Sequence, residues 1–367
     1  MQVTELFELV RRFAVEGEPI EEKINTSGHI NKTHIIITKD ADGQQHRYIL
    51  QRINTAVFTK PVELMDNIKK VTEYLREQIR ANGGDPARET MTLIPCHDGK
   101  CYAVDSEGGY WRMYLFVPNT VSYDMATTPA LFENAGYAFG HFQHSLEHYP
   151  AAELAETITN FHNTESRYRD FLRAVEENRS GRRDQVEKEI RFIMDRAEKC
   201  SYITSRLASG EIPMRVTHND TKLNNVLIDE TTGEAICVVD LDTVMPGSVL
   251  YDFGDGIRFG ASSAAEDETD LDKVYLRLDM FESYTKGFLR GCDHSLTDSE
   301  LDALPMGAYL ITLETGMRFL GDHLNGDTYF AIHREGHNLD RARTQLKLVA
   351  DMEANMDKMH RIVATYR

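Results

Sequence analysis

The chain has 367 residues, of which 41% are hydrophobic, and its formal net charge at pH 7 is −18. This length exceeds one average domain and supplies enough apolar residues for a sizeable core or for two joined lobes. The negative charge argues against nonspecific binding to nucleic acid or to an anionic membrane surface, because both need basic patches. A ligand that carries phosphate would therefore need local cations or metal ions.

The start of the chain and its cysteines indicate a cellular compartment. Residues 1–18, MQVTELFELVRRFAVEGE, alternate apolar and charged residues at helical spacing and lack the uninterrupted apolar core of a signal peptide. No later apolar run approaches the length of a membrane span. The five cysteines are odd in number and scattered, which is typical of a reducing compartment. We therefore expect a soluble, cytoplasmic protein.

The first third of the chain predicts a small lobe that is rich in strands. Asn31–Asn54 reads as two strands around a turn at Asp42-Gly43, and apolar residues at helical spacing predict a helix over Pro61–Ala81. Further strand-like segments follow at Met91–Pro95, Lys100–Val104 and Trp111–Val117. We expect this lobe to end near Pro118.

Most of the remaining chain predicts helices. Helical periodicity covers Pro129–Leu146, Asp184–Leu207, Leu271–Arg290, Leu301–Leu324 and Leu339–Thr365. The exception is the strand-like region from Met214 to Asp242. The sequence thus predicts an α+β protein of two lobes, with a small β-rich domain at 1–117 and a larger, mostly helical domain at 118–367.

The strand-like region contains a polar loop that is suited to chemistry. The stretch VTHNDTKLNNVLID places a polar block between two apolar runs, Met214–Thr217 and Val226–Ile228, which we expect to be short buried strands. A later apolar run, Ile236–Val239, leads directly into Asp240. Because strands hold the loop at both ends, its side chains are expected to have fixed positions.

The spacing of this loop resembles a known catalytic pattern. His218-x-Asp220-x-x-x-x-Asn225 is similar to the catalytic loop of the protein-kinase-like phosphotransferases, in which the Asp accepts the proton of the acceptor hydroxyl and the Asn binds Mg²⁺. These enzymes have a second metal carboxylate at the end of a following strand, where this chain has Asp240, because Mg²⁺ prefers oxygen ligands and bridges nucleotide phosphates. The two motifs predict phosphoryl transfer, with Asp220 as the catalytic base and Asn225 and Asp240 as metal ligands.

Three further loop residues have expected roles. Lys222 is predicted to place a cation beside the transferred phosphate, and the alternative is an ordinary surface lysine. We expect His218 to be a buried residue whose hydrogen bonds shape the loop. Asn219, next to Asp220, is assigned to substrate binding.

Several segments together resemble one family. They are RVTHNDTKLNNVLIDETTGEAICVVDLDTVMPGSVLYDFGDGIRFGAS, GHINKT, YILQRINT, TLETGMRFLGDHLNGDTYF and RTQLKLV. Over nearly the whole chain they are similar to the N-acetylhexosamine 1-kinases, a group within the aminoglycoside-phosphotransferase and choline-kinase superfamily. The resemblance implies a two-lobed protein-kinase-like fold, ATP and Mg²⁺ as cofactors, and phosphorylation of the anomeric hydroxyl of N-acetylglucosamine or N-acetylgalactosamine to the sugar 1-phosphate.

The small lobe departs from the protein-kinase pattern at the nucleotide. The segment NTSGHINKT has only Gly28 where protein kinases have a glycine-rich loop, and YILQRIN offers the permanently charged Arg52 where they have a strand lysine. Whether a helix glutamate pairs with Arg52 is left open, because Glu63 and Glu73 are both available and spacing does not choose between them. Adenine is expected against the backbone of a hinge between the lobes. The nucleotide-binding residues are thus predicted to be Gly28, Arg52, Phe116 and Val117.

The resemblance also implies an acceptor site. It places His29 near the sugar hydroxyls and Arg318 at the sugar. Tyr329, just after the turn NGDT, is suited to stack its ring on the apolar face of a pyranose. Taken alone, these residues also allow a loop histidine without a partner, a surface ion pair between Glu314 and Arg318, and a core tyrosine. Two residues of a charged segment that follows Asp240 are assigned to the sugar pocket as well: Arg258 and Phe259.

The same charged segment, DTVMPGSVLYDFGDGIRFG, is expected to support the catalytic loop. In this superfamily one such Asp braces the loop through hydrogen bonds, and Asp252 fits that role best by position. Asp242 is assigned to the same supporting role.

Two other functions compete with a sugar kinase. An aminoglycoside or choline kinase would suit an acidic surface, although choline recognition favours an aromatic cage and the only tryptophan, Trp111, lies in the small lobe. A nucleotide-binding pseudoenzyme would keep the fold without the reaction, but the intact Asp220, Asn225 and Asp240 argue against it. The expected partners are ATP and a small-molecule acceptor, with no nucleic acid and no membrane.

Overall fold

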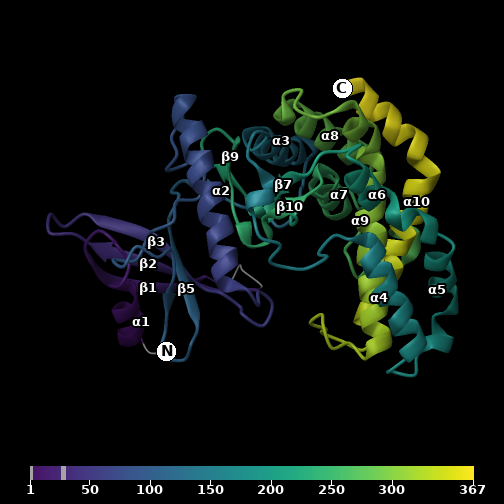
Figure 1. Ribbon diagram of the computed structural model, residues 1–367, viewed down its shortest axis with the longest axis horizontal. Helices are drawn as coiled ribbons and strands as arrows, with labels where there is room; N and C mark the ends of the chain where they lie inside the picture. Colours follow the sequence, from purple (N-terminus) through teal and green to yellow (C-terminus); the bar gives the residue numbers. More distant parts are fainter. Residues whose placement is uncertain (1–2, 26–29) are drawn as a thin grey trace. The chain divides into compact units, whose positions relative to one another are not determined.

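The computed structural model describes residues 3–25 and 30–367. Its backbone forms two compact units, and the first takes up segments from separate parts of the sequence, as the chain colours of Figure 1 show. Unit 1 consists of Met1–Val121, Glu153–Ile158 and Leu227–Met245. Unit 2 consists of Ser122–Ala152, Thr159–Val226 and Pro246–Arg367.

Specific contacts bind the later segments to unit 1. Strand β6 (Thr120–Val121) pairs with β8 (Val226–Asp229), which in turn pairs with β9 (Ala235–Val238). On helix α2 (Pro61–Ala81), Asn67 donates to the carbonyls of Ala155 at 2.8 Å and Val244 at 3.0 Å. The boundary expected after residue 117 had assigned these segments to the second domain. The division into functional domains at 1–117 and 118–367 stays a prediction.

Unit 1 contains a five-stranded sheet with the strand order β1-β2-β3-β5-β4, in which all neighbours are antiparallel. Its strands are β1 (Glu18–Asn25), β2 (Lys32–Lys39), β3 (Gln45–Arg52), β4 (Ala103–Val104) and β5 (Tyr110–Leu115). The predicted hairpin turn at Asp42-Gly43 is confirmed, because Gly43 has a φ of 84° and donates to the carbonyl of Asp40 at 3.1 Å. The predicted strand at Met91–Pro95 is instead an isolated bridge of Leu93 to Tyr114.

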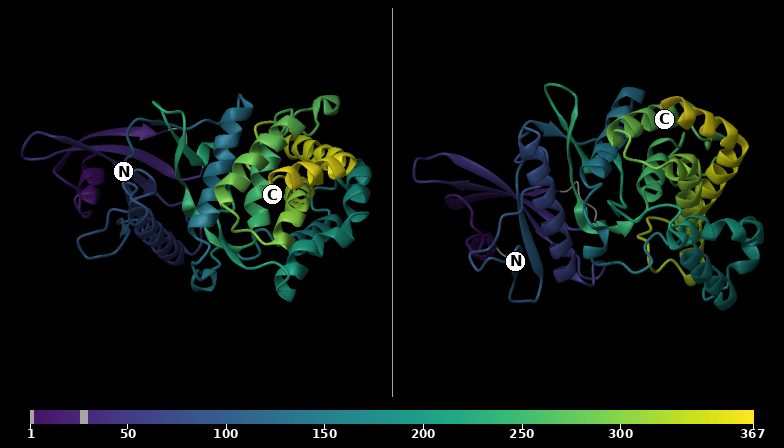
Figure 2. Two further views of the ribbon diagram at one scale, coloured as in Figure 1. Left: turned by 90° about the horizontal axis from the view of Figure 1, so that it is seen from above. Right: turned by 45° about the horizontal axis from the view of Figure 1, so that its top comes forward.

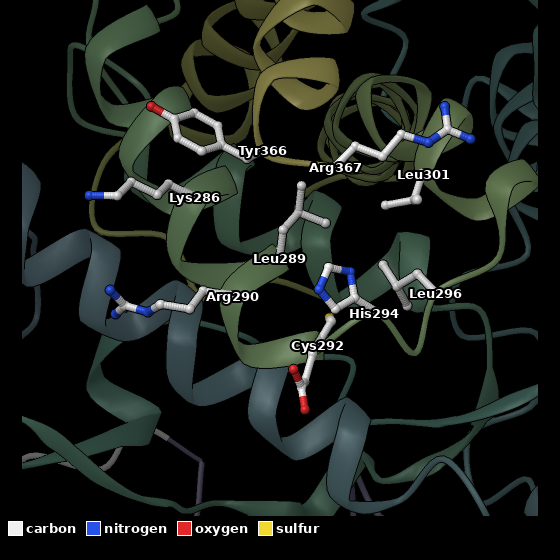
Figure 3. Close-up of a pocket in the computed structure, with 10 residues that line it drawn as sticks. Lys286, Leu289, Arg290, Cys292, His294, Leu296, Leu301, Tyr366 and Arg367 are labelled. Carbon is white, nitrogen blue, oxygen red and sulfur yellow. The ribbon is translucent and has the colours of Figure 1, made fainter.

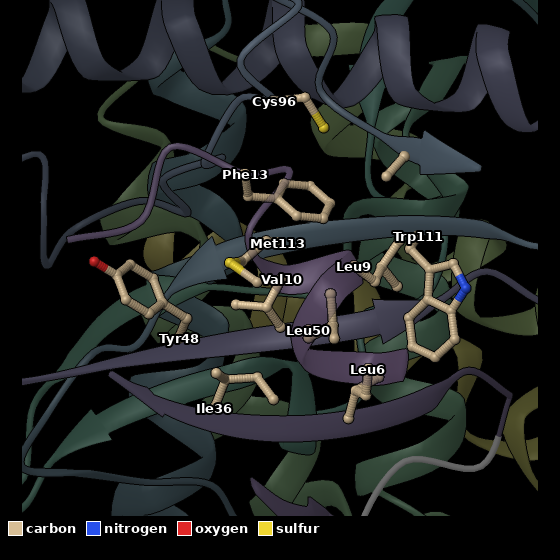
Figure 4. Close-up of a cluster of buried hydrophobic side chains, with 11 residues drawn as sticks. Leu6, Leu9, Val10, Phe13, Ile36, Tyr48, Leu50, Cys96, Trp111 and Met113 are labelled. Atoms are coloured by element: carbon tan, nitrogen blue, oxygen red, sulfur yellow. The ribbon is translucent and has the colours of Figure 1, made fainter. Parts of the chain in front are cut away.

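The core of unit 1 lies between this sheet and the first helix, α1 (Val3–Val10). Figure 4 shows the side chains that meet there, which come from α1, the sheet and the segments beside them. The members of this cluster are Leu6, Leu9, Val10, Phe13, Ile36, Tyr48, Leu50, Cys96, Ala103, Trp111 and Met113. Both views of Figure 2 show α2 beside the sheet. Burial of these apolar groups stabilises the small lobe.

Unit 2 is built mainly from helices. They are α3 (Pro129–Ser145), α4 (Thr164–Glu177), α5 (Glu187–Met194), α6 (Tyr202–Ser209), α7 (Val249–Gly260), α8 (Leu278–Cys292), α9 (Asp298–Asn325) and α10 (His337–Tyr366). Two short strands pair beside them, β7 (Arg215–Thr217) and β10 (Met245–Gly247). Its short 3-10 turns are η2 (Arg183–Gln185), η3 (Ala197–Ser201), η4 (Leu223–Asn225) and η6 (Leu271–Lys273), whereas η5 (Leu241–Thr243) belongs to unit 1 and η1 (Ala151–Glu153) crosses the boundary of the units. Helix α10 packs along α9, as Figure 2 shows.

Glycines set the close approach of α3 and α8. A Cβ atom on Gly140 of α3 would collide with the backbone of Phe288, and one on Gly287 of α8 would collide with the backbone of Glu133. The two helices therefore pack backbone to backbone, at a distance that larger side chains would prevent.

The predicted fold is confirmed: a small lobe with an antiparallel sheet joins a larger lobe that is mostly helical. Within the described residues, none of the helices is both long and apolar enough to cross a membrane.

Candidate active site

The polar loop lies in unit 2, between β7 and β8, and the turn η4 forms its last part. Its first half is bonded to Asp252, at the start of α7. The carboxylate of Asp252 accepts hydrogen bonds from the backbone N–H groups of His218 at 2.9 Å and Asn219 at 2.7 Å, and from Nε2 of Gln143 at 2.7 Å. Burial raises the pKa of the Asp252 carboxyl, while His218 and these hydrogen bonds act against the rise. Asp252 thus fixes the backbone just before Asp220.

The carboxylate of Asp220 is held by two loop residues. Its Oδ1 atom lies 2.7 Å from Nζ of Lys222, and its Oδ2 atom accepts a hydrogen bond from Nδ2 of Asn225 at 3.2 Å. Nδ2 of Asn225 also donates to the backbone carbonyl of Asp220 at 2.8 Å. Both bonds use the amide nitrogen of Asn225, so they do not engage its oxygen, which is the atom that binds metal ions.

Lys222 is more than a surface lysine. Burial alone would lower the pKa of its ammonium group, but the carboxylates of Asp220 and Asp255 raise that pKa above the ordinary value. Lys222 therefore stays charged beside Asp220, where the sequence pattern had placed a cation.

Asp255 and Arg258 form a second, buried layer under the loop. Asp255 accepts hydrogen bonds from the backbone N–H of Thr221 and from Nε of Arg258, both at 3.0 Å. Burial would raise the pKa of Asp255, but Arg258, Lys222 and His162 outweigh it and lower the pKa. Arg258 also donates to Glu266 at 3.0 Å, so the guanidinium reaches the loop through Asp255.

Phe259, the neighbour of Arg258, is half-buried, and its ring centre lies 5.9 Å from the guanidinium carbon of Arg258. This pair had been assigned to the sugar pocket from the sequence. Because two carboxylates occupy the guanidinium of Arg258, a role for Arg258 in shaping the loop fits the geometry better than direct contact with a sugar.

Asp240 and Asp242 lie in unit 1, directly after β9. Asp240 has a φ of 62°, in the left-handed region that Asn and Asp tolerate better than other non-glycine residues. Asp242 is buried and forms an ion pair with Arg112 of β5, and it accepts a hydrogen bond from Nδ2 of Asn31 at 2.6 Å. These contacts fix the segment that carries Asp240.

Sequence reasoning missed Arg112. Its side chain is 1% exposed, and its Nε and Nη2 atoms both donate to Oε1 of Gln51, at 3.0 and 2.9 Å. Burial would lower the pKa of the guanidinium, yet Asp242 raises it above its usual range. The signal was available, because the strand YWRMYL places one charge in the middle of an apolar run. A charged residue at such a position needs a buried partner.

We predict that Arg112→Met lowers the free energy of unfolding by about 3 to 5 kcal/mol, because it leaves the Asp242 carboxylate buried without its cation. The matched control is Arg11→Met, since Arg11 forms an exposed pair with Glu18 at 2.8 Å, for which we expect a change of less than about 1 kcal/mol. Urea unfolding of both variants measures the difference. Equal losses would show that the buried pair adds nothing specific.

Three of the residues predicted for the nucleotide belong to unit 1: Arg52, Phe116 and Val117. Arg52 ends β3, with Nη2 3.4 Å from Glu107 and 3.7 Å from Asp105. Arg52 thus pairs with the turn between β4 and β5, and not with Glu63 or Glu73, the two candidates on α2. Phe116 donates its backbone N–H to Arg47 at 3.2 Å, and the carbonyl of Val117 accepts from Oγ1 of Thr120 at 3.0 Å. Two predicted residues lie outside the described part of the chain: Gly28 and His29.

Two residues assigned to the sugar site lie in unit 2: Arg318 on α9 and Tyr329 on the turn that follows α9. The guanidinium of Arg318 lies over the rings of Phe161 and Phe330, at 5.8 and 5.4 Å from their centres. Tyr329 is 70% exposed, which excludes a core tyrosine. The suggested surface pair of Glu314 with Arg318 is also wrong, because Glu314 is buried and bonds elsewhere.

Asp322 organises the turn that carries Tyr329. Its carboxylate accepts the backbone N–H groups of Thr328, Tyr329 and Phe330 at 3.0, 2.9 and 2.9 Å. It also accepts Nδ2 of Asn338 at 2.9 Å. These hydrogen bonds to Asp322 thus fix the turn that carries the exposed ring of Tyr329.

A separate pocket of unit 2 lies where α8 ends, α9 begins and α10 ends (Figure 3). Its lining residues are Lys286, Leu289, Arg290, Cys292, Asp293, His294, Leu296, Leu301, Tyr366 and Arg367. Its cations are engaged, because Lys286 and Arg290 pair with Glu133 at 3.1 and 2.9 Å. The pocket contains no residue of the polar loop.

Comparison with known proteins identifies the family. The sequence profile described as the phosphotransferase enzyme family matches residues 22–282, a span that contains Asp220 and Asp240. This span is more than half of the chain.

Solved structures show the same fold. The microcompartment-associated aminopropanol kinase is similar with a TM-score of 0.60 and 16% identity, over 98% of this chain and 99% of that chain. A spectinomycin phosphotransferase in complex with ADP and spectinomycin has a TM-score of 0.59 and 12% identity, over 98% and 99%. An amicoumacin kinase in complex with AMP-PNP, Ca²⁺ and Ami has a TM-score of 0.55 and 13% identity, over 95% and 93%. The predicted kinase-like fold is thereby confirmed, and the chain belongs to the phosphotransferase enzyme family.

Proposed function

We propose that the protein is an ATP-dependent kinase that phosphorylates the anomeric hydroxyl of an N-acetylhexosamine. Membership of the phosphotransferase family supports the reaction class. The observation that carries the proposal is the Asp220 carboxylate, which lies 2.7 Å from Lys222 and 3.2 Å from Asn225. Hydrogen bonds to Asp252 and Asp255 hold the backbone of this loop. The segments that resemble N-acetylhexosamine 1-kinases support the acceptor.

The chemistry assigns a task to each loop residue. Asp220 orients the acceptor hydroxyl and accepts its proton as the phosphoryl group arrives. Lys222, which stays charged, stabilises negative charge on the transferred group. Asn225 and Asp240 each carry oxygen donors of the kind that Mg²⁺ prefers, so these two residues would hold the ion, which would offset the charge of the nucleotide phosphates.

The two predicted domains are assigned different substrates. Domain 1–117 would bind the nucleotide through Gly28, Arg52, Phe116 and Val117. Domain 118–367 would supply the catalytic loop and the sugar site, and His29 is also assigned to acceptor binding. Asn219 and Phe259 belong to the proposed acceptor site, and His218, Asp242 and Asp252 support the loop and the metal segment.

Two neighbouring arginines, Arg167 and Arg318, argue for a sugar over the competing cationic acceptors. Burial lowers the pKa of the Arg167 guanidinium, and the charge of the neighbouring Arg318 lowers it further. Two arginines beside Phe161 and Tyr329 would repel an aminoglycoside or choline, whereas a neutral pyranose can stack its apolar face on an exposed ring and accept hydrogen bonds from a guanidinium.

We predict that Arg318→Ala raises the KM for N-acetylglucosamine by about tenfold to a hundredfold, because a hydrogen bond from a charged donor contributes about 1.5 to 3 kcal/mol. The KM for ATP should change by less than about threefold. The control is Arg206→Ala, since Arg206 also lies over an aromatic ring, Tyr202, at 3.6 Å. Steady-state kinetics decide between the outcomes. Equal rises in both KM values would show that Arg318 acts through packing.

One experiment tests the function itself. The protein is incubated with ATP, Mg²⁺ and a panel of N-acetylhexosamines, hexoses, aminoglycosides and choline, and the products are read by phosphorus NMR. We expect phosphate on C1 of an N-acetylhexosamine. Phosphate on C6, or transfer only to a cationic acceptor, would overturn the proposed acceptor. Nucleotide binding without turnover on any acceptor would indicate a pseudoenzyme.

A further inference from the structure

The peptide group that joins Asn219 to Asp220 is held at both ends by histidines. Its carbonyl oxygen, on Asn219, lies 3.1 Å from Nε2 of His162. Its N–H, on Asp220, donates to Nδ1 of His218 at 3.3 Å. Asn219 itself has a φ of 65°, in the left-handed region, so its conformation depends on such contacts. The orientation of this one peptide sets the direction in which the Asp220 side chain leaves the backbone.

The two histidines need opposite roles at these atoms. A carbonyl oxygen only accepts hydrogen bonds, so Nε2 of His162 must carry a proton. The N–H of Asp220 only donates, so Nδ1 of His218 must be without one. Each ring therefore has a defined protonation at the atom that faces the peptide.

The other ring nitrogen of His162 faces a carboxylate. Nδ1 of His162 lies 3.0 Å from Oε1 of Glu314, and Oγ1 of Thr164 donates to Oε2 of the same carboxylate at 3.0 Å. With Nε2 already protonated, the contact between Nδ1 and Oε1 requires one further proton, shared by His162 and Glu314. Both side chains are buried, with exposures of 7% for His162 and 1% for Glu314. Water is therefore a poor substitute for either partner.

The surroundings of His162 restrict the ring further. Its centre lies 5.4 Å from the ring of Tyr251 and 4.5 Å from that of Phe161. The charged groups near it include Asp255, whose pKa His162 helps to lower, and Glu314. A ring that is packed by aromatic groups and bonded at both nitrogens has one orientation.

We propose that His162, Glu314 and Thr164 are positioning residues for phosphoryl transfer, which set the direction of Asp220 through the carbonyl of Asn219. This inference rests on the proposed function of Asp220 as the base. The chain of bonds runs from Thr164 on α4 and Glu314 on α9, through His162, to the loop. It joins helices of the large lobe to the peptide that precedes the reacting carboxylate.

Two substitutions of Glu314 test the proposal. Glu314→Ala removes the partner of Nδ1 and frees the ring, so we expect kcat to fall by about tenfold to a hundredfold, the range for a misplaced catalytic group. The KM values for ATP and N-acetylglucosamine should change by less than about threefold, because the Glu314 carboxylate is 1% exposed and bonds to His162 and Thr164. Glu314→Gln should restore kcat to within about threefold of the wild type. Its amide nitrogen can donate to Nδ1 and its oxygen can accept from Thr164, so the ring keeps both bonds without the extra proton.

The control separates positioning from general loss of stability. Glu353 is another carboxylate of the large lobe with several partners, since it accepts from Arg196, Lys199 and Tyr309 at distances of 2.6 to 3.1 Å. Glu353→Ala should lower the melting temperature without changing kcat. A wild-type kcat in Glu314→Ala, or a Glu314→Gln variant as slow as Glu314→Ala, would overturn the proposal.

Nitrogen-15 NMR of histidine-labelled protein gives a readout that does not depend on activity. In the wild type, Nε2 of His162 should carry a proton and a further proton should be detected on the His162–Glu314 bond; in Glu314→Gln only the Nε2 proton should remain. A His162 ring without a proton on Nε2 would contradict the inference, even if Glu314→Ala does not fold. If Asp220→Asn turned over like the wild type, the proposed function would fail whatever these variants do. A loss in Asp220→Asn with none in Glu314→Ala would leave that function intact and reject the positioning role alone.

Discussion

An Asp240→Asn variant should fold like the wild type and lose turnover by roughly 10³-fold at ordinary Mg²⁺ concentrations, because the amide cannot offset the charge of a cation that supplies several kcal/mol of stabilisation. The substitution suits the backbone. Asp240 has a φ of 62°, and Asn adopts this left-handed conformation at least as readily as Asp. A loss of activity would therefore report on the missing charge and not on a distorted turn.

The matched control is Asp293→Asn, which makes the same change at another aspartate with a positive φ, 45°, at the end of α8. We expect its kcat to equal that of the wild type. Turnover is measured for both variants across a titration with Mg²⁺ and then with Mn²⁺. If Asp240→Asn kept its activity at ordinary Mg²⁺, Asp240 would not be a metal ligand, and the proposed pair of Asn225 with Asp240 would be rejected.

Local motifs were predictable from the sequence because each lies within a short stretch of chain. Spacing alone predicted the catalytic loop from His218 to Asn225. It also predicted the strand that leads into Asp240. The flanking strands β7 and β8 fall where the apolar runs predicted them. Fold class was equally accessible, since helical periodicity dominates the second lobe and short strand-like segments dominate the first.

Other elements could not be predicted from the sequence because their hydrophobic patterns are weak. Strand β1, EPIEEKIN, consists mostly of charged residues, and its Ile20 and Ile24 are exposed, so it has no apolar face to recognise. Helix α7 contains glycines that lower helix propensity. The structure explains them, because a Cβ atom on Gly254 would collide with the backbone of Gly307. Tertiary packing therefore overrides propensity there.

The bonds that support the catalytic loop were not predictable, because they join distant parts of the chain. His162 and Glu314 are separated by 152 positions, and Arg112 lies far from Asp242 in sequence. No local spacing relates such pairs. The sign that the sequence carries is a charge in the middle of an apolar element, as at Glu314 and Arg112, since a charge at such a place needs a partner.

The second large effect is expected for Asp220→Asn, for which we predict a fall in kcat of roughly 10² or more, within the range for general acid–base catalysis. Asn keeps the shape of the side chain and one oxygen, so it can still accept from either Lys222 or Nδ2 of Asn225, which contact different oxygens of the carboxylate at 2.7 and 3.2 Å. It removes the negative charge and the basicity. Sugar and ATP should still bind, so their KM values should change little.

The size of the loss distinguishes two roles for Asp220. Phosphoryl transfer passes through a loose transition state in which the acceptor hydroxyl needs little help from a base, so a fall of only about tenfold would mark Asp220 as a group that orients the hydroxyl. Single-turnover kinetics with N-acetylglucosamine separate the chemical step from product release and measure this loss directly. The comparison with Glu314→Ala then tells whether charge or direction of the carboxylate matters more. A near wild-type rate in Asp220→Asn would refute the assignment of the catalytic loop, because no reaction that depends on this carboxylate survives its neutralisation unchanged.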